Sequence, residues 1–311
     1  MVSKKTAFIV NPYSGNGATG KEWPSIREKA GKCLGPFDVY LTNTPGDATT
    51  LARQALKNGA DRIICIGGDG TLNEVINGLM DEKGPVNRDV VLGFLPNGTG
   101  CDFVRTVPIP KNIDRALDTI SHGVVREIDL GRVQYVDKQG KTAVRYFDNI
   151  ASFGLGGEVV DRVNCTSKAL GPFICFLWST LIALLLFGKK KIRFTVDDGP
   201  EQEATCWNIA VANGQYHGGG MQVAPDALVD DGLLHITVLG DLNLAQVFWH
   251  LPKLYTGKIG VVKQVEMMTG TKVSAWSDQR VLIDMDGEQP GYLPAQIDIV
   301  PAALKLITGE G

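Results

Sequence analysis

The segment 63–80, IICIGGDGTLNEVINGLM, constrains the fold most, because it combines a buried strand, a glycine loop and a helix. Its first four residues form an apolar run typical of a strand buried on both faces, and apolar residues then recur at helical spacing. Gly67, Gly68 and Gly70 let backbone N–H groups approach a ligand at a helix N-terminus, where anions are favoured. The segment therefore predicts a phosphate site.

Asp69 lies inside this loop and needs an explanation of its own. A carboxylate would repel a phosphate, so Asp69 is better suited to hold Mg²⁺ or to contact a nucleotide through a metal or a hydroxyl group. The alternative is a tight strand-to-helix turn in which Asp69 only caps the helix.

Residues 6 to about 125 alternate between strand and helix patterns. Such alternation indicates βαβ units, with a mostly parallel sheet covered on both faces. The loops at the carboxyl ends of parallel strands gather at one crevice. The predicted strands are 7–10, 39–41, 63–66 and 90–95, and the predicted helices are 48–56, 72–79 and 113–120.

Four loops of small hydrogen-bonding residues follow these strands, and together they predict a nucleotide-triphosphate site. They are 11–17 (NPYSGNG), 42–48 (TNTPGDA), 67–73 (GGDGTLN) and 96–103 (PNGTGCDF).

Residues 15–20 match the G-x-G-x-x-G dinucleotide fingerprint, which we discount. Four residues, 11–14, separate the strand from these glycines, and the second strand ends in Thr42 and Asn43 instead of an acidic residue. The chain also has no G-x-x-x-x-G-K-[ST] loop. A bound ATP would therefore need another phosphate-binding device.

After about residue 127 the chain reads as successive strands separated by turns, which predicts an all-β sandwich or barrel. Two helical stretches, 169–188 and 242–255, interrupt this pattern. We expect a nucleotide-binding α/β domain at 1–127 and a β domain at 128–311, whose last strand could return to the first domain.

Segment 169–188 is uncharged and about as long as a membrane span. Pro172 and the flanking glycines shorten its continuous apolar core, which favours a buried or interfacial helix over a spanning one. The lysines that follow, at 189–191, could lie against anionic lipid headgroups in a peripheral membrane contact.

Composition excludes several classes of protein. A net charge of −3 argues against nonspecific nucleic-acid binding. The six cysteines form no C-x-x-C pair and there are only four histidines, so the sequence suggests neither a disulfide framework nor a zinc site. The apolar run at the N-terminus is too short for a secretory signal. These features favour a cytoplasmic protein that is at most peripheral on the inner membrane face. The sequence is also compatible with a homodimer.

Carboxylates are concentrated in two motifs of the second half. In 224–234, Asp226, Asp230 and Asp231 surround a turn, which alone favours an Asp-Gly hairpin. In 281–291, strand alternation places Asp284 and Asp286 on one face, followed by Glu288. These residues could form a solvated edge, or they could deprotonate an alcohol.

The motifs NPYSG, GGDGTLNEVINGL, PNGTGCDF, APDALVDDGLL and DMDGE, in this order and spacing, resemble the diacylglycerol kinase catalytic-domain family. Among its members, the bacterial soluble lipid kinases are similar in length. The resemblance spans essentially the whole chain. It implies an N-terminal α/β domain like that of NAD kinases, a C-terminal β-sandwich, and ATP with Mg²⁺ bound between them.

The resemblance also implies roles for particular residues. Glu288 would be the base, with Asp286 beside it and Asp69 helping to place metal and nucleotide. Asp231 and the carbonyl groups of Leu228 and Leu233 would hold a structural Mg²⁺. The contacts to ATP would come from Asn11, Pro12, Ser14, Gly15, Thr42, Gly67, Gly68, Asp69, Gly70, Thr71, Leu72, Asn73 and Thr99.

One residue departs from the family pattern: Cys101 stands where the family usually carries Asn, and a thiol is a weak hydrogen-bonding group. The leading hypothesis is a kinase that phosphorylates a lipid hydroxyl, on diacylglycerol, a sphingoid base, phosphatidylglycerol or another alcohol. The alternatives are an NAD kinase, and a nucleotide-binding or lipid-binding protein without turnover. His217, before three glycines, either lines the cleft or lies on a plain turn.

Overall fold

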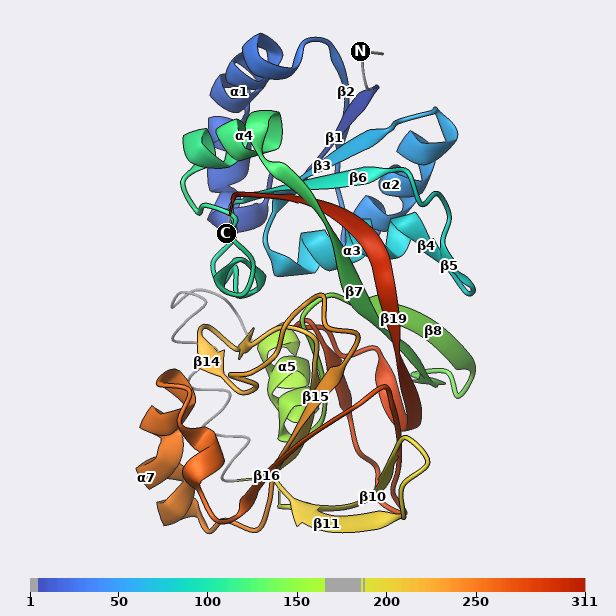
Figure 1. Cartoon of the computed structure of the whole chain (residues 1–311), viewed down its shortest axis with the longest axis vertical. Helices are drawn as coiled ribbons and strands as arrows, with labels where there is room; N and C mark the ends of the chain where they lie inside the picture. The colour runs from blue at the N-terminus through green and yellow to red at the C-terminus, as the bar shows by residue number, and fades with distance from the viewer. Residues whose placement is uncertain (1–4, 166–185, 187, 311) are drawn as a thin grey trace. The chain divides into compact units, whose positions relative to one another are not determined.

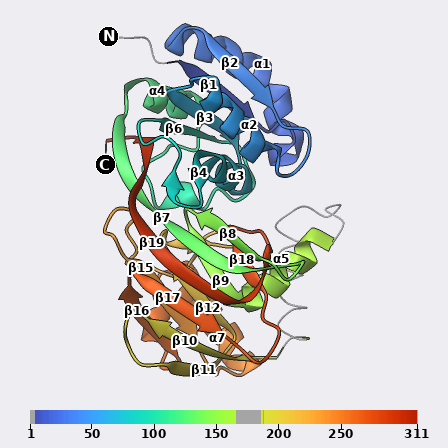
Figure 2. The same ribbon diagram turned by 90° about the vertical axis from the view of Figure 1, so that its right-hand side faces the viewer.

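The computed structural model describes residues 5–165, 186 and 188–310. The chain forms two compact units (Figures 1 and 2): unit 1 comprises Met1–Leu130 and Pro301–Gly311, and unit 2 comprises Gly131–Val300. Two strands, β7 (Val124–Asp137) and β19 (Gly291–Thr308), contain these divisions. The chain therefore leaves unit 1 and returns to it within strands.

Unit 1 is built on the parallel sheet that the alternating pattern predicts. Its strand order is β2-β1-β3-β6, and the C-terminal part of β19 continues the sheet beside β6, with Lys305 opposite Val91. A short hairpin, β4 (Met80–Asp81) and β5 (Gly84–Pro85), follows α3. The main strands are β1 (Thr6–Val10), β2 (Phe37–Leu41), β3 (Arg62–Gly67) and β6 (Val91–Pro96).

Helices cover both faces of this sheet, because its strands are apolar on both sides. Side chains of α1 and α4 pack with Phe8, Ile64 and Leu95 in one core, whereas α2 and α3 pack against each other and against β1 and β3 (Figure 1). The helices are α1 (Ser14–Leu34), α2 (Asp47–Lys57), α3 (Asp69–Leu79) and α4 (Ile113–His122), with a short 3-10 turn, η1 (Phe103–Arg105).

Unit 2 is a sandwich of two β layers, as the sequence predicts. One layer has the strand order β16-β15-β12-β9-β18, and the other contains β11-β10-β17-β19 with β7 and β8. Its further strands are β8 (Thr142–Phe147), β9 (Ile150–Gly154), β10 (Lys190–Val196), β11 (Gln202–Cys206), β12 (Asn208–Ala212), β13 (Tyr216–His217), β14 (Met221–Gln222), β15 (Leu234–Leu239), β16 (Val265–Gly270), β17 (Lys272–Trp276) and β18 (Ile283–Met285).

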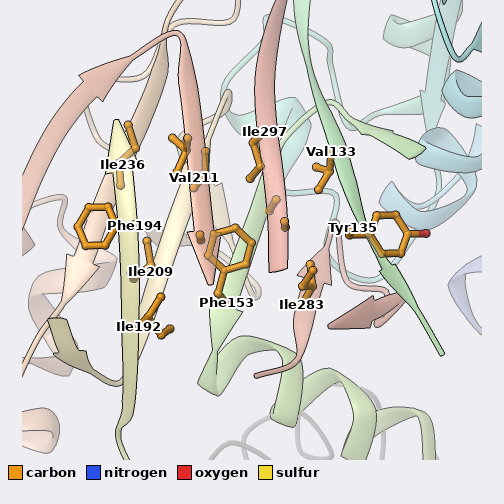
Figure 3. Close-up of a cluster of buried hydrophobic side chains, with 14 of the residues drawn as sticks. Val133, Tyr135, Phe153, Ile192, Phe194, Ile209, Val211, Ile236, Ile283 and Ile297 are labelled. Atoms are coloured by element: carbon orange, nitrogen blue, oxygen red, sulfur yellow. The ribbon is translucent and has the colours of Figure 1, made fainter. Parts of the chain in front are cut away.

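The core of the sandwich draws on both layers. Figure 3 shows Phe153 of β9, Phe194 of β10 and Ile297 of β19 within one buried cluster. Helices α5 (Leu155–Cys165) and α7 (Leu244–Tyr255) and the turn η3 (Ile259–Val261) complete the described part of unit 2. A capping box at Asn243 and Gln246 fixes the start of α7.

The apolar segment 169–188, with Trp178 and Phe176, lies outside the described residues except for Leu186 and Gly188. Within the described part of the chain, no helix has the length and apolarity needed to span a bilayer.

Candidate active site

The four predicted loops of unit 1 follow β1, β2, β3 and β6 at the carboxyl end of the sheet. Strand β1 lies between β2 and β3. The chain runs from β1 to β2 on one side of β1 and then crosses to β3 on the other side, so the strand order reverses at β1. Ligands of open α/β sheets bind at such a switch point. The loops 11–17 and 67–73 flank it.

A hydrogen bond joins the first of these loops to the third. The Asn11 side chain donates to the Thr71 hydroxyl at 2.9 Å, and the Asn11 backbone N–H donates to the Ile66 carbonyl at 3.0 Å. Asn11, at the end of β1, is thereby held against the start of α3. Two residues of the predicted ATP site thus come together.

Backbone contact between glycines joins the third loop to the fourth. The Asn97 N–H donates to the Gly67 carbonyl at 2.8 Å. A Cβ on Gly98 would lie 2.4 Å from the Gly68 Cα, and a Cβ on Gly67 would lie 2.6 Å from the Thr71 side chain. Gly98 is required because the close atom is backbone, which cannot rotate away, whereas a Cβ at Gly67 would force the Thr71 side chain to shift.

Asp69 binds the fourth loop directly. Its carboxylate accepts hydrogen bonds from the backbone N–H groups of Asp102, at 3.0 Å, and Phe103, at 3.4 Å. The N-cap residue of α3 is Gly68, and no side chain makes a capping hydrogen bond there. Asp69 is therefore more than a helix cap, since it orders the loop that carries Thr99.

The second loop is held by Glu74, which the sequence analysis did not single out. The Glu74 carboxylate accepts from the N–H groups of Gly46 and Ala48, at 2.8 and 3.1 Å. Thr42 is buried and its N–H donates to the Val10 carbonyl at 3.0 Å. The only sequence signal for Glu74 is its place in α3, five residues beyond Asp69.

The first loop continues into α1 with three residues in the left-handed region. Gly15, Asn16 and Gly17 have φ values of 58°, 56° and 82°. The Ser14 hydroxyl donates to the Asn11 carbonyl at 3.0 Å. This irregular entry differs from the direct strand-to-helix turn of the dinucleotide fingerprint, which agrees with discounting that match.

Cys101 adopts a left-handed conformation, with φ of 48°, and its side chain is buried. Asn tolerates this conformation better than most residues do, so an Asn at the position would suit the backbone. Burial, followed by the charge of Asp69, raises the pKa of the Cys101 thiol to about 11. The thiol is therefore neutral at physiological pH.

We expect Cys101 to resist alkylation in the folded protein. With a pKa of about 11, roughly one thiol in a thousand is ionised at pH 8, and the thiolate is the reactive form. Exposed Cys33 is the internal control and should react first. Peptide mapping after iodoacetamide treatment measures both rates, and rapid labelling of Cys101 before unfolding would contradict the prediction.

In unit 2, the motif DMDGE forms a two-residue hairpin turn. Asp286 and Gly287 have φ values of 47° and 85°, and the backbone groups of Met285 and Glu288 exchange two hydrogen bonds of 2.8 and 2.9 Å. These are the features of a type I′ turn, for which Asp-Gly is a preferred sequence. The turn fixes the position from which Glu288 extends.

Asp284 and Asp286 are both buried, so the solvated-edge interpretation is wrong. Asp286 accepts from the N–H groups of Ile150, at 2.8 Å, and Asp148, at 3.1 Å. Burial raises the pKa of Asp286 above its ordinary value, and the nearby charge of Asp284 adds to the effect. Asp286 thus holds the β8–β9 junction against the hairpin.

Glu288 is the accessible carboxylate of the motif, with 37% of its side chain exposed. Arg145, on β8, contacts it with 2.7 Å between Nη1 and Oε2. The sequence analysis did not find Arg145, because its proximity depends on strand pairing across the fold. The arginine fixes the direction in which the carboxylate points.

His217 lies beside the buried carboxylate of Asp284. Its Nε2 is 3.1 Å from Asp284 Oδ2, and the other oxygen of Asp284 accepts from the Gly287 N–H at 3.0 Å. His217 lies at the end of β13, directly before the turn at 218–220, and it also lines a pocket within unit 2. It connects the hairpin of Glu288 to that pocket.

The pocket is partly open to solvent, has a cavity volume of about 130 Å³ and is almost entirely apolar. His217 and His250 supply polar atoms, and His250 Nδ1 is buried with no hydrogen-bond partner among the described residues. The walls come mainly from the first turns of α5 and from α7, through Leu155, Val159, Val160, Val247, Leu251 and Leu254.

The predicted metal-binding residues lie before β15. Asp231 accepts from the Leu233 N–H at 2.9 Å, and its other oxygen is 3.2 Å from His235 Nε2. Leu228 is exposed and Asp231 is partly exposed. One carboxylate and two backbone carbonyl groups offer only oxygen donors, which suit Mg²⁺.

The comparisons with known proteins agree with this architecture. Residues 5–133 match the diacylglycerol kinase catalytic domain, and residues 149–308 match the YegS C-terminal NAD kinase beta sandwich-like domain. A diacylglycerol kinase of Staphylococcus saprophyticus is 31% identical, over 94% of this chain and 91% of its own.

Two solved structures resemble the chain. A Bacillus anthracis str. Sterne protein, provisionally named a diacylglycerol kinase, has a TM-score of 0.79 at 26% identity, covering 98% of this chain and 95% of that one. Yeast NADH kinase has a TM-score of 0.52 at 11% identity over 100% and 85% of the two chains, and this likeness concerns the fold alone. The chain therefore belongs to the diacylglycerol kinase catalytic-domain family of lipid kinases.

Proposed function

We propose that this protein transfers the γ-phosphate of ATP to the hydroxyl group of diacylglycerol or a similar lipid, in a reaction that needs Mg²⁺. The loops of unit 1 would bind the nucleotide, through the residues that the resemblance implies. Unit 2 would hold the lipid and supply the base. In phosphoryl transfer, the protein contributes mainly by positioning the reactants and neutralising their charge.

The apolar pocket of unit 2 carries the proposal for a lipid. Its aliphatic walls suit the apolar part of a lipid, whereas a soluble dinucleotide would gain little from them. The pocket is connected through His217 and Asp284 to the hairpin of Glu288. A lipid lodged there would direct its polar end toward that hairpin.

Glu288 is the proposed general base. As the acceptor oxygen bonds to the γ-phosphorus, its proton passes to the Glu288 carboxylate and the bond to the ADP oxygen breaks. Exposure of the side chain lets an external hydroxyl reach it, and Arg145 orients it. Asp286, buried and bonded to two N–H groups, is a positioning residue.

Mg²⁺ is proposed in two places. When bound with the nucleotide, it neutralises charge on the phosphates. In unit 2, Asp231 with the carbonyl groups of Leu228 and Leu233 would hold a second ion, and their oxygen donors fit that role. This ion would steady the turn before β15.

Labelled ATP tests the proposal. The purified chain is incubated with γ-labelled ATP and Mg²⁺ against diacylglycerol, a sphingoid base, phosphatidylglycerol, NAD or no acceptor. Label in one lipid supports the proposal and identifies the acceptor class. Label in NAD overturns it, and ATP binding with no transfer to any of these acceptors assigns the chain to a binding protein.

A narrower pocket should reduce kcat/KM more for long-chain acceptors than for short-chain acceptors. Val247→Trp adds bulk to the α7 wall and should reduce kcat/KM for a long-chain acceptor at least about tenfold, since even one methylene in an apolar pocket is worth about 1–3 kcal/mol. A short-chain acceptor in detergent should be affected much less. Val247→Ala is the matched control, and an equal loss for both acceptors in Val247→Trp would argue against chain binding here.

A further inference from the structure

Residues 242–265 combine many apolar residues with basic residues. The stretch carries Lys253, Lys258 and Lys263 but no Asp or Glu, although the whole chain has a net charge of −3. It folds into α7, η3 and the turns around them. Positive charge and apolar side chains are therefore concentrated in this one segment of unit 2.

Helix α7 is apolar on two faces. One face, with Val247, Leu251 and Leu254, lines the pocket. The other leaves large side chains in solvent: Phe248 is 47% exposed and Trp249 is 79% exposed. A helix that is apolar all round is normally buried, so the second face indicates a partner surface.

We define the α7 surface as these exposed apolar residues together with the three lysines. Besides Phe248 and Trp249, its apolar members are Leu244, Tyr255 and Val261. Val261, on the neighbouring turn η3, is 72% exposed. Aromatic side chains beside lysines are the composition that places a helix in the headgroup layer of a membrane.

The lysines of the α7 surface are available for a partner. None of the three forms an ion pair with another described residue. By contrast, Lys189 pairs with Asp241 and Lys191 pairs with Glu203, so the basic cluster noted in the sequence is largely neutralised within the fold. The α7 surface is a better electrostatic match for an anionic layer than that cluster.

We infer that the α7 surface docks on a bilayer containing anionic phospholipid. Trp249 and Phe248 would enter the interface, and the three lysines would reach the anionic headgroups. A second copy of the chain fits less well, because a symmetric contact would bring the same lysines face to face. The inference rests on the proposed function in one respect, since a lipid acceptor could then reach the pocket behind α7 from the membrane.

Vesicle sedimentation of the full chain tests this inference without requiring turnover. Wild type should bind phosphatidylcholine vesicles that contain phosphatidylglycerol, bind pure phosphatidylcholine vesicles far less, and lose affinity as salt is added. The triple variant Lys253→Gln, Lys258→Gln, Lys263→Gln should lose about a hundredfold in affinity, from about fivefold for each lysine. Trp249→Ala should lose roughly tenfold.

The matched control is Lys57→Gln, Lys83→Gln, Lys138→Gln, which removes three exposed lysines elsewhere and should keep most of the binding. All variants should keep the wild-type melting temperature and the wild-type rate on a short-chain acceptor in detergent. Equal binding of the two triple variants, or equal binding to neutral and anionic vesicles, would overturn the inference. Self-association that Trp249→Ala abolishes, with no vesicle binding, would assign the surface to a second copy. Absence of phosphate transfer with intact vesicle binding would contradict the proposed function alone.

Discussion

Glu288→Gln should lower kcat for the lipid acceptor by about 10²–10⁴-fold, the range that a positioned general base contributes. The amide keeps the shape of the side chain and can still lie near Arg145, but it cannot accept the hydroxyl proton. Affinity for ATP should stay near the wild-type value, because the proposed nucleotide contacts are in unit 1. Steady-state kinetics and calorimetric titration with ATP measure the two quantities.

Glu201→Gln is the control for this variant. Glu201 is an exposed glutamate of the same unit, and its replacement should change neither quantity. Thermal unfolding of both variants excludes a loss through instability. A Glu288→Gln protein that retains the wild-type kcat would falsify the assignment of this residue as the base, whatever the acceptor.

Gly98→Ala should have the second largest effect, on both stability and nucleotide binding. The new Cβ would lie 2.4 Å from the Gly68 Cα, and Gly68 is backbone that cannot rotate away. The two loops must separate, at a cost typical of overpacking, about 1–3 kcal/mol in unfolding free energy. We expect ATP affinity to fall at least tenfold, since the separated loops carry the proposed contacts.

Gly31→Ala is the matched control for a methyl group at glycine. A Cβ at Gly31 would meet nothing within 4 Å, and the residue lies inside α1. It should raise the unfolding free energy by about 0.5–1 kcal/mol, because alanine favours a helix over glycine. Urea unfolding compares the two variants. A stable Gly98→Ala protein with normal ATP affinity would show that the glycine contact is dispensable.

The architecture of both units could be predicted from local patterns. Strand-and-helix alternation in the first half, and short strands with turns in the second, are properties of neighbouring residues, and the structure confirms both. The sequence pattern did not predict helix α1, and the reason is also local. It is largely polar, contains Pro24, and begins with three left-handed residues, so it shows no clear apolar period.

The partners of the site residues could not be predicted in the same way. Glu74 reaches Gly46 across 28 positions, and Arg145 reaches Glu288 from a strand that precedes it by 143 positions (288 minus 145). Such pairs arise from tertiary packing, which no periodicity encodes. The Asp-Gly turn at 286–287 did carry a local signal, but its hydrogen bonds to the β8–β9 junction did not.

The split of unit 1 between Met1–Leu130 and Pro301–Gly311 has a consequence for biosynthesis. When the ribosome has completed β6, strand β19, which pairs with the outer edge of β6, has not yet been synthesised. About 170 residues of unit 2 must be synthesised before it. The chain from Pro96, the last residue of β6, to Lys305 of β19 is 209 residues long (305 minus 96), so at about 5–20 residues per second the delay is on the order of ten to forty seconds. The nascent sheet therefore has an open edge throughout that time, and a message truncated before codon 301 would leave the edge open for good.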